Sequence, residues 1–118
     1  DVLGQYAGHA QPALVLRRRG DAYDAWSGAG PVPGAVLREL ARQAGVFIYS
    51  ETDDPTWANQ SLFGLYAHLG GQRTICFPKD VVLEDVYQDG TLIPSVGKTV
   101  VLECQDDEMR LFRVLSGQ

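Results

Sequence analysis

Residues 61–77, SLFGLYAHLGGQRTICF, contain two apolar and aromatic runs on either side of Gly70 and Gly71. Runs of this composition favour β-strands. Two adjacent glycines between such runs are typical of a two-residue hairpin turn, because glycine tolerates the positive φ that this turn requires. We therefore expect a β-hairpin with strands over residues 61–68 and 72–77.

The same pattern continues towards the C-terminus, where short strand-like runs alternate with turn residues. The first of these runs places Val81, Leu83 and Tyr87 on one face. The acidic segment 105–108 reads as the loop of a second hairpin. Antiparallel strands with apolar residues towards both faces suggest a small sandwich. Further strands are expected over residues 81–87, 99–104 and 109–115.

The first fifty residues combine strands with the one convincing helix. Gly20 and Asp21 supply turn chemistry between two β-like runs, which predicts a hairpin. Pro33 suits the first turn of a helix and Gly45 suits its C-terminal end. The hairpin strands are expected over residues 12–18 and 22–26. The apolar stripe of the helix is formed by Val36, Leu37, Leu40, Ala41 and Ala44.

Residues 46–50, VFIYS, read as a strand that follows the helix and returns to the sheet. The expected fold class is therefore α+β, mostly β: a small antiparallel β-sandwich with one amphipathic helix in an N-terminal strand-helix-strand unit. The character of the chain changes near residues 51–56. We expect two parts, residues 1–50 resembling the end of an α/β domain and residues 51–118 forming a small antiparallel β-domain.

Composition excludes several classes of function. The chain has 118 residues and a net charge of −5, from 10 Lys+Arg against 15 Asp+Glu. Nucleic-acid binding needs a basic face, so we expect no nucleic-acid partner. No apolar run approaches the roughly 18 residues that span a bilayer, and no signal segment leads the chain. The compartment stays open, with the cytoplasm slightly favoured. The start at Asp1 suggests an excised or processed piece.

The two cysteines, Cys76 and Cys104, lie inside apolar runs. We expect two buried thiols that act as small hydrophobic groups. A disulfide would require neighbouring strands with Cα atoms within about 7 Å. Two cysteines and two scattered histidines, His9 and His68, do not form a metal-ligand pattern, and neither histidine has partners at the spacing of a catalytic triad. No metal, cofactor or catalytic residue is assigned.

A glycine segment before the helix offers one candidate ligand site. Gly28 and Gly30 follow a strand and precede the helix, and acidic residues follow about twenty residues later, which is the layout of a dinucleotide site. Pro31 and Pro33 remove N–H donors where phosphate would need them. An ordinary loop that enters a helix explains the segment equally well.

Aromatic and acidic residues offer a second candidate site. Trp57 and Tyr49, with the nearby carboxylate of Asp53, could bind a sugar ring by stacking and hydrogen bonding. Packing in the core is the more usual fate of aromatic residues in strands. The acidic cluster that contains Asp53 and Asp54 reads mainly as a solvated turn.

Several motifs along the chain resemble the C-terminal region of large bacterial glycoside hydrolases of the β-galactosidase type that carry a trimerisation domain. The resemblance covers nearly the whole chain, and its motifs are structural. They are Trp26-Ser27-Gly28, residues 37–46 (LRELARQAGV), 58–61 (ANQS), 74–78 (TICFP), 83–87 (LEDVY) and 109–113 (MRLFR).

In that family the catalytic acid and nucleophile lie in an N-terminal barrel, for which 118 residues leave no room. The resemblance therefore implies a non-catalytic accessory or assembly domain, whose partners are the rest of a parent chain or other copies of itself. We expect no turnover by this chain alone. The alternatives are a carbohydrate-binding module and a nucleotide-binding α/β fragment.

Overall fold

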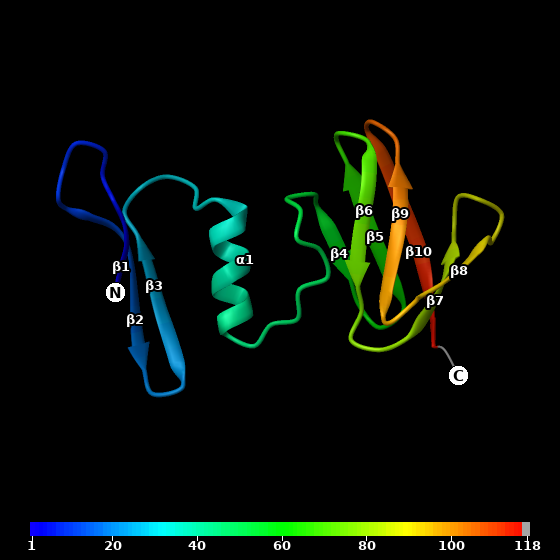
Figure 1. Cartoon of the computed structure of the whole chain (residues 1–118), viewed down its shortest axis with the longest axis horizontal. Coiled ribbons are helices and arrows are strands. Elements are labelled where there is room, and N and C mark those ends of the chain that lie inside the picture. Colours follow the sequence, from blue (N-terminus) through cyan, green and yellow to red (C-terminus); the bar gives the residue numbers. More distant parts are fainter. Residues whose placement is uncertain (117–118) are drawn as a thin grey trace. The chain divides into compact units, whose positions relative to one another are not determined.

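The computed structural model describes residues 1–116 and divides into two compact units, Asp1–Val46 (unit 1) and Phe47–Gln118 (unit 2). Within the described residues, antiparallel strands dominate and one helix is present, so the α+β, mostly β fold class is confirmed (Figure 1). No helix in the described part of the chain is long and apolar enough to cross a membrane.

Unit 1 contains a three-stranded antiparallel sheet in the order β1-β2-β3, followed by helix α1. The hairpin between β2 and β3 is confirmed, and Gly20 has the positive φ of 61° that its turn requires. Pro33 precedes α1, and Gly45 follows it with a φ of 83°. The elements are β1 (Val2–Gln5), β2 (Pro12–Arg19), β3 (Ala22–Ser27) and α1 (Gly34–Gln43).

Residues 46–50 form no strand, contrary to the expected strand-helix-strand unit. The aromatic rings of this segment contact the core of unit 2 instead of extending the sheet of unit 1: the Tyr49 ring centroid lies 5.7 Å from that of Phe77 and 6.1 Å from that of Phe63. The segment makes one backbone bond to a strand, from the Cys76 N–H to the Tyr49 carbonyl. Its apolar composition reflects packing, not strand pairing.

The described part of unit 2, residues 47–116, is built from seven strands in two sheets. One sheet has the order β4-β5-β10-β7-β8, and the other pairs β6 with β9. In Figure 1, β6 and β9 lie in front of β5 and β10. The strands are β4 (Thr56–Ala58), β5 (Leu62–Ala67), β6 (Gly71–Cys76), β7 (Val81–Asp85), β8 (Leu92–Pro94), β9 (Thr99–Cys104) and β10 (Glu108–Ser116).

The hydrophobic core of unit 2 lies between these two sheets, as expected for a sandwich. Alternation along each strand sends every second side chain inward, so both sheets contribute to one cluster. Phe63 and Phe112 are fully buried at its centre, with ring centroids 6.5 Å apart. The cluster comprises Phe63, Leu65, Ala67, Ile75, Phe77, Val81, Leu83, Val100, Leu102, Cys104 and Phe112.

The predictions of two hairpins in this unit are both wrong. Strand β5 pairs with β4 and β10, whereas β6 pairs with β9. The glycine turn and the acidic turn therefore each carry the chain from one sheet to the other. The two turns meet, because the Gly70 N–H donates a 2.6 Å hydrogen bond to Asp106 Oδ1. The Gly70 N–H, which a hairpin turn would have paired locally, thus finds its partner in a distant part of the chain.

Strand β7 ends two residues earlier than the alternation suggested. Val81 and Leu83 are buried as expected, but the third inward residue is Asp85, and Tyr87 is exposed. Asp85 Oδ1 accepts hydrogen bonds from the backbone N–H groups of Tyr87 and Gln88. These bonds turn the chain out of the sheet.

The expectation of two buried thiols holds for Cys104 but not for Cys76, which is exposed. Strands β6 and β9 are neighbours, yet the register pairs Gly71 with Cys104 and Cys76 with Thr99. The cysteines therefore lie at opposite ends of the ladder, roughly 17 Å apart by strand geometry, too far for a disulfide.

Candidate functional site

The clearest candidate site lies on the outer face of the five-stranded sheet, where it is not covered by β6 and β9. Trp57 on β4 is paired with Gly64 on β5, and Leu111 on β10 is paired with the same glycine. Paired residues point to the same side of a sheet, so these side chains share the outer face. Met109 lies beside them. We call this surface the Trp57 groove.

Gly64 shapes the floor of the Trp57 groove. A Cβ atom at this position would lie 3.2 Å from Met109 Cε and 3.7 Å from Trp57 Cε3. The absence of a side chain therefore lets the tryptophan and methionine lie close to the sheet, while Trp57 remains 58% exposed. The groove encloses about 640 Å³ and is lined by Thr56, Trp57, Ala58, Asn59, Leu62, Gly64, Met109 and Leu111.

The chemistry of the Trp57 groove is apolar. Among the described residues, none that lines it is charged. Asn59 Oδ1 already accepts the backbone N–H groups of Ser61 and Leu62. A sugar site needs several directed polar groups beside an aromatic ring, whereas a protein contact needs an apolar centre. The groove therefore fits an apolar segment of a protein better than a saccharide.

Tyr49, the second residue of the predicted sugar site, lies on the other side of this sheet. Its ring packs against Phe63 and Phe77, both of which face the core. It also lines a separate groove of about 680 Å³ beside Pro78 and Lys79. The structure therefore does not bring Tyr49 together with Trp57, and the two rings form no common stacking surface.

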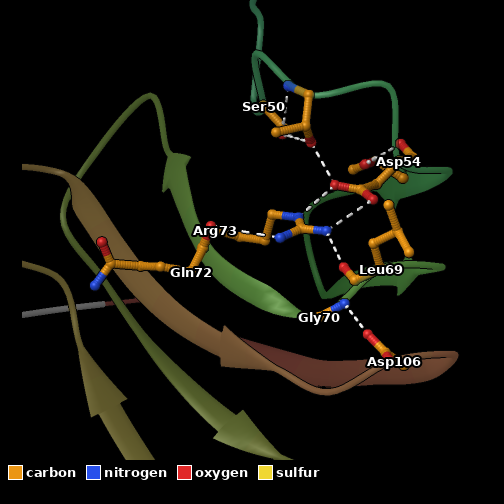
Figure 2. A network of polar contacts seen from close by, with 9 residues as sticks. Ser50, Asp54, Leu69, Gly70, Gln72, Arg73 and Asp106 are labelled. Atoms are coloured by element: carbon orange, nitrogen blue, oxygen red, sulfur yellow. Dashed lines mark hydrogen bonds and ion pairs between the residues drawn. The ribbon is translucent and has the colours of Figure 1, made fainter.

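Asp53 is exposed in the loop before β4, but its neighbour Asp54 has a different environment. Arg73 Nε donates a 2.7 Å hydrogen bond to Asp54 Oδ2, and both side chains are nearly buried, at 12% and 11% exposed (Figure 2). Arg73 also donates to the Leu69 carbonyl. The hydrogen bond from Arg73 holds the pKa of Asp54 below its ordinary value. Asp54 is thus a structural ion-pair partner and not part of a solvated turn.

A second polar cluster was missed at the level of the sequence because its members are far apart in the chain. Asp107 Oδ1 accepts a 2.9 Å hydrogen bond from the Tyr66 hydroxyl and lies 2.8 Å from His68 Nδ1. These bonds, from His68 first and Tyr66 second, lower the pKa of Asp107, and the bond to Asp107 raises the pKa of Tyr66. The cluster is exposed, and one carboxylate oxygen of Asp107 makes both contacts.

The glycine segment before α1 is occupied by local contacts. The Gly28 N–H donates to the Ala13 carbonyl, and the Ser27 hydroxyl donates to the Ala29 carbonyl. The adjoining hollow of about 220 Å³ has no basic residue in its lining among the described residues. Phosphate binding relies on converging N–H groups and cationic side chains. The segment serves as a connection between β3 and α1.

Comparison with known proteins gives no indication of function for this chain. No protein-family model, curated protein or solved structure matches the chain. No group of three or more His, Cys, Asp or Glu side chains is placed to hold a metal ion within residues 1–116. The Trp57 groove combines a largely exposed aromatic ring with an uncharged lining.

Proposed function

We propose that this chain is a non-catalytic accessory domain of a carbohydrate-active, glycoside hydrolase-like protein, and that it acts in assembly through the Trp57 groove. The observation that carries the assembly role is the uncharged groove around a largely exposed tryptophan. The link to a carbohydrate-active parent rests on the motifs that resemble the C-terminal region of bacterial β-galactosidases. The partner is a second copy of the chain or another part of the parent protein.

The energetics favour Trp57 as the anchor of such a contact. A tryptophan side chain has an area of about 250 Å², so covering its exposed part would contribute roughly 3 kcal/mol. Tryptophan is also among the residues that dominate binding energy when they lie at the centre of an interface. Met109 and Leu111 extend the apolar area on the neighbouring strand.

Unit 1 supports the same role. Ala13 is the only buried hydrophobic residue among residues 1–46, all of which the structure describes. No residue of α1, likewise described in full, is buried, and Leu37 of its predicted apolar stripe is exposed. A folded unit without a core gains little from hydrophobic burial. Unit 1 therefore depends on contacts beyond its own residues.

Sedimentation velocity and the indole N–H resonances in ¹H–¹⁵N spectra test this proposal. We expect the chain to associate as its concentration rises, or to bind the remaining polypeptide of its parent, with a shift of the Trp57 resonance. Trp57→Ala should weaken the association at least about tenfold, which corresponds to 1.4 kcal/mol. Arg113→Ala, on the same outer face but outside the groove lining, is the matched control.

A chain that stays monomeric and does not bind its parent polypeptide would contradict the proposal. An association that Trp57→Ala leaves unchanged would contradict the role of the groove.

A further inference from the structure

The exposed face of the β1-β2-β3 sheet carries a second tryptophan in a different chemical setting. The register pairs Val15 with Trp26 and Arg17 with Asp24, so all four side chains point to one face, as does Arg19 two residues further along β2. Residues of the opposite face, Tyr23 and Ala25, line a groove together with Leu40 of α1 and Ala44, which directly follows the helix. The helix therefore lies on the other side of the sheet from Trp26.

Gly28 leaves the space that the Trp26 ring occupies. A Cβ atom added to Gly28 would lie 2.5 Å from Trp26 Cη2 and would also collide with the hydroxyl of Tyr6. The far edge of the indole therefore lies over the glycine, and the Tyr6 hydroxyl approaches the same position. Even so, Trp26 is 57% exposed. This arrangement presents a positioned aromatic surface to solvent.

Charged groups lie next to this ring. Arg19 Nε is 2.8 Å from Asp24 Oδ2, and Arg17 Nε is 3.9 Å from the same oxygen. All three side chains are exposed. Two guanidinium groups, each with five donors, cannot be satisfied by one carboxylate. The face therefore has a local excess of one positive charge in a chain whose net charge is −5.

We propose that this Trp26 face binds a saccharide that carries a carboxylate group, such as a uronic acid oligomer. The electron-rich face of the indole attracts the C–H groups on the flat side of a pyranose ring. Arg17, the less tightly paired arginine, binds the carboxylate of the sugar in the bidentate geometry that guanidinium favours. Asp24, held in place by Arg19, accepts a hydrogen bond from a sugar hydroxyl.

The spacing on the strand suits this class of ligand. Trp26 and Asp24 are two residues apart, and strand geometry separates them by roughly 7 Å, which is comparable to the size of a sugar ring. One ring can stack on Trp26 while its neighbour meets the charged groups. An acidic peptide would use the arginines but would have no flat ring to place on the indole. This inference is independent of the Trp57 groove, which lies in the other unit.

The test uses the full chain and the two indole N–H resonances of its two tryptophans. A galacturonic acid tetramer is titrated against the protein, with a galactose tetramer and a tetraglutamate peptide as matched probes. We expect the galacturonic acid tetramer to shift the Trp26 resonance and leave the Trp57 resonance in place. Trp57→Phe assigns the two resonances and should retain binding.

Two variants separate stacking from charge. Trp26→Ala should weaken binding of the galacturonic acid tetramer at least about tenfold, and Arg17→Gln should do the same while the Trp26 resonance shows that the fold is retained. Tyr23→Ala, on the opposite face, is the control for Trp26→Ala. Equal affinity for the neutral tetramer or the acidic peptide would overturn the inference, as would a lack of binding or full binding by Trp26→Ala. None of these outcomes bears on assembly through Trp57.

Discussion

Arg110 of β10 forms a buried ion pair with Asp85 of β7: Arg110 Nη2 lies 3.0 Å from Asp85 Oδ2, and the Asp85 side chain is only 1% exposed. Arg110 Nη1 donates a second hydrogen bond of 2.7 Å to the Glu103 carbonyl of β9. A single arginine thus joins the five-stranded sheet to the two-stranded sheet. Its planar set of donors allows this, because the two bonds leave in different directions.

Arg110→Met should destabilise unit 2 by about 3–5 kcal/mol, because it leaves the Asp85 carboxylate buried without its partner. Methionine retains most of the apolar stem, so the loss reports the ion pair more than the packing. Arg113→Met on the same strand is the matched control. Its guanidinium is exposed and 3.7 Å from Glu84, so we expect a change of at most about 1 kcal/mol. Urea unfolding measures both, and equal losses would contradict the joining role of Arg110.

The Asp54–Arg73 pair should make stability depend on acid pH. Because Arg73 lowers the pKa of Asp54 in the folded state, folding favours the ionised carboxylate. This contribution is complete above the unfolded pKa of about 4 and is lost as the pH falls through the lower pKa of the folded state.

Asp54→Asn should therefore lower the free energy of unfolding by about 3 kcal/mol at pH 7, with a much smaller difference from the original chain near pH 2. Urea unfolding across this range measures the difference. A constant difference at all pH values would show that Asp54 acts through packing.

Local signals in the sequence predicted five strands of unit 2 (β5, β6, β7, β9 and β10), but not the short strands β4 and β8, and not the strand partners. The runs over residues 61–68, 72–77 and 99–104 correspond to β5, β6 and β9. Glycine pairs and acidic turns indicate that the chain reverses direction. They carry no information about whether the next strand pairs with its predecessor or crosses to another sheet. That choice depends on distant contacts such as Gly70 with Asp106.

The candidate site was likewise only partly predictable. Trp57 could be proposed as a binding residue from the sequence, because it is an aromatic residue next to a predicted strand. Gly64 and Met109 could not be predicted as its neighbours, since they reach it only through the pairing of three strands. Tyr49 was grouped with Trp57 by proximity along the chain, yet the sheet separates them. Asp107 likewise meets His68 only after both turns have formed.

Gly70→Ala should destabilise the connection between the sheets. A Cβ atom at Gly70 would lie 2.9 Å from the Cys104 carbonyl and 3.0 Å from the Asp106 backbone nitrogen, and backbone atoms cannot move aside easily. We expect a loss of about 1–3 kcal/mol in urea unfolding. Gly30→Ala, where an added Cβ meets nothing within 4 Å, should change stability by less than about 1 kcal/mol. A neutral Gly70→Ala would contradict the close contact of the two turns.

The two thiols should react at very different rates. Cys76 is exposed, whereas burial removes Cys104 from solvent and raises the pKa of its thiol, which lowers the fraction of reactive thiolate. With a chromogenic disulfide reagent at pH 8, we expect one fast equivalent and a second at least about tenfold slower, which becomes fast in urea. Cys76→Ser should abolish the fast phase and Cys104→Ser should leave it unchanged. Two fast equivalents in the native chain would show that Cys104 is not in the core. They would also contradict the register in which β9 turns Cys104 inward.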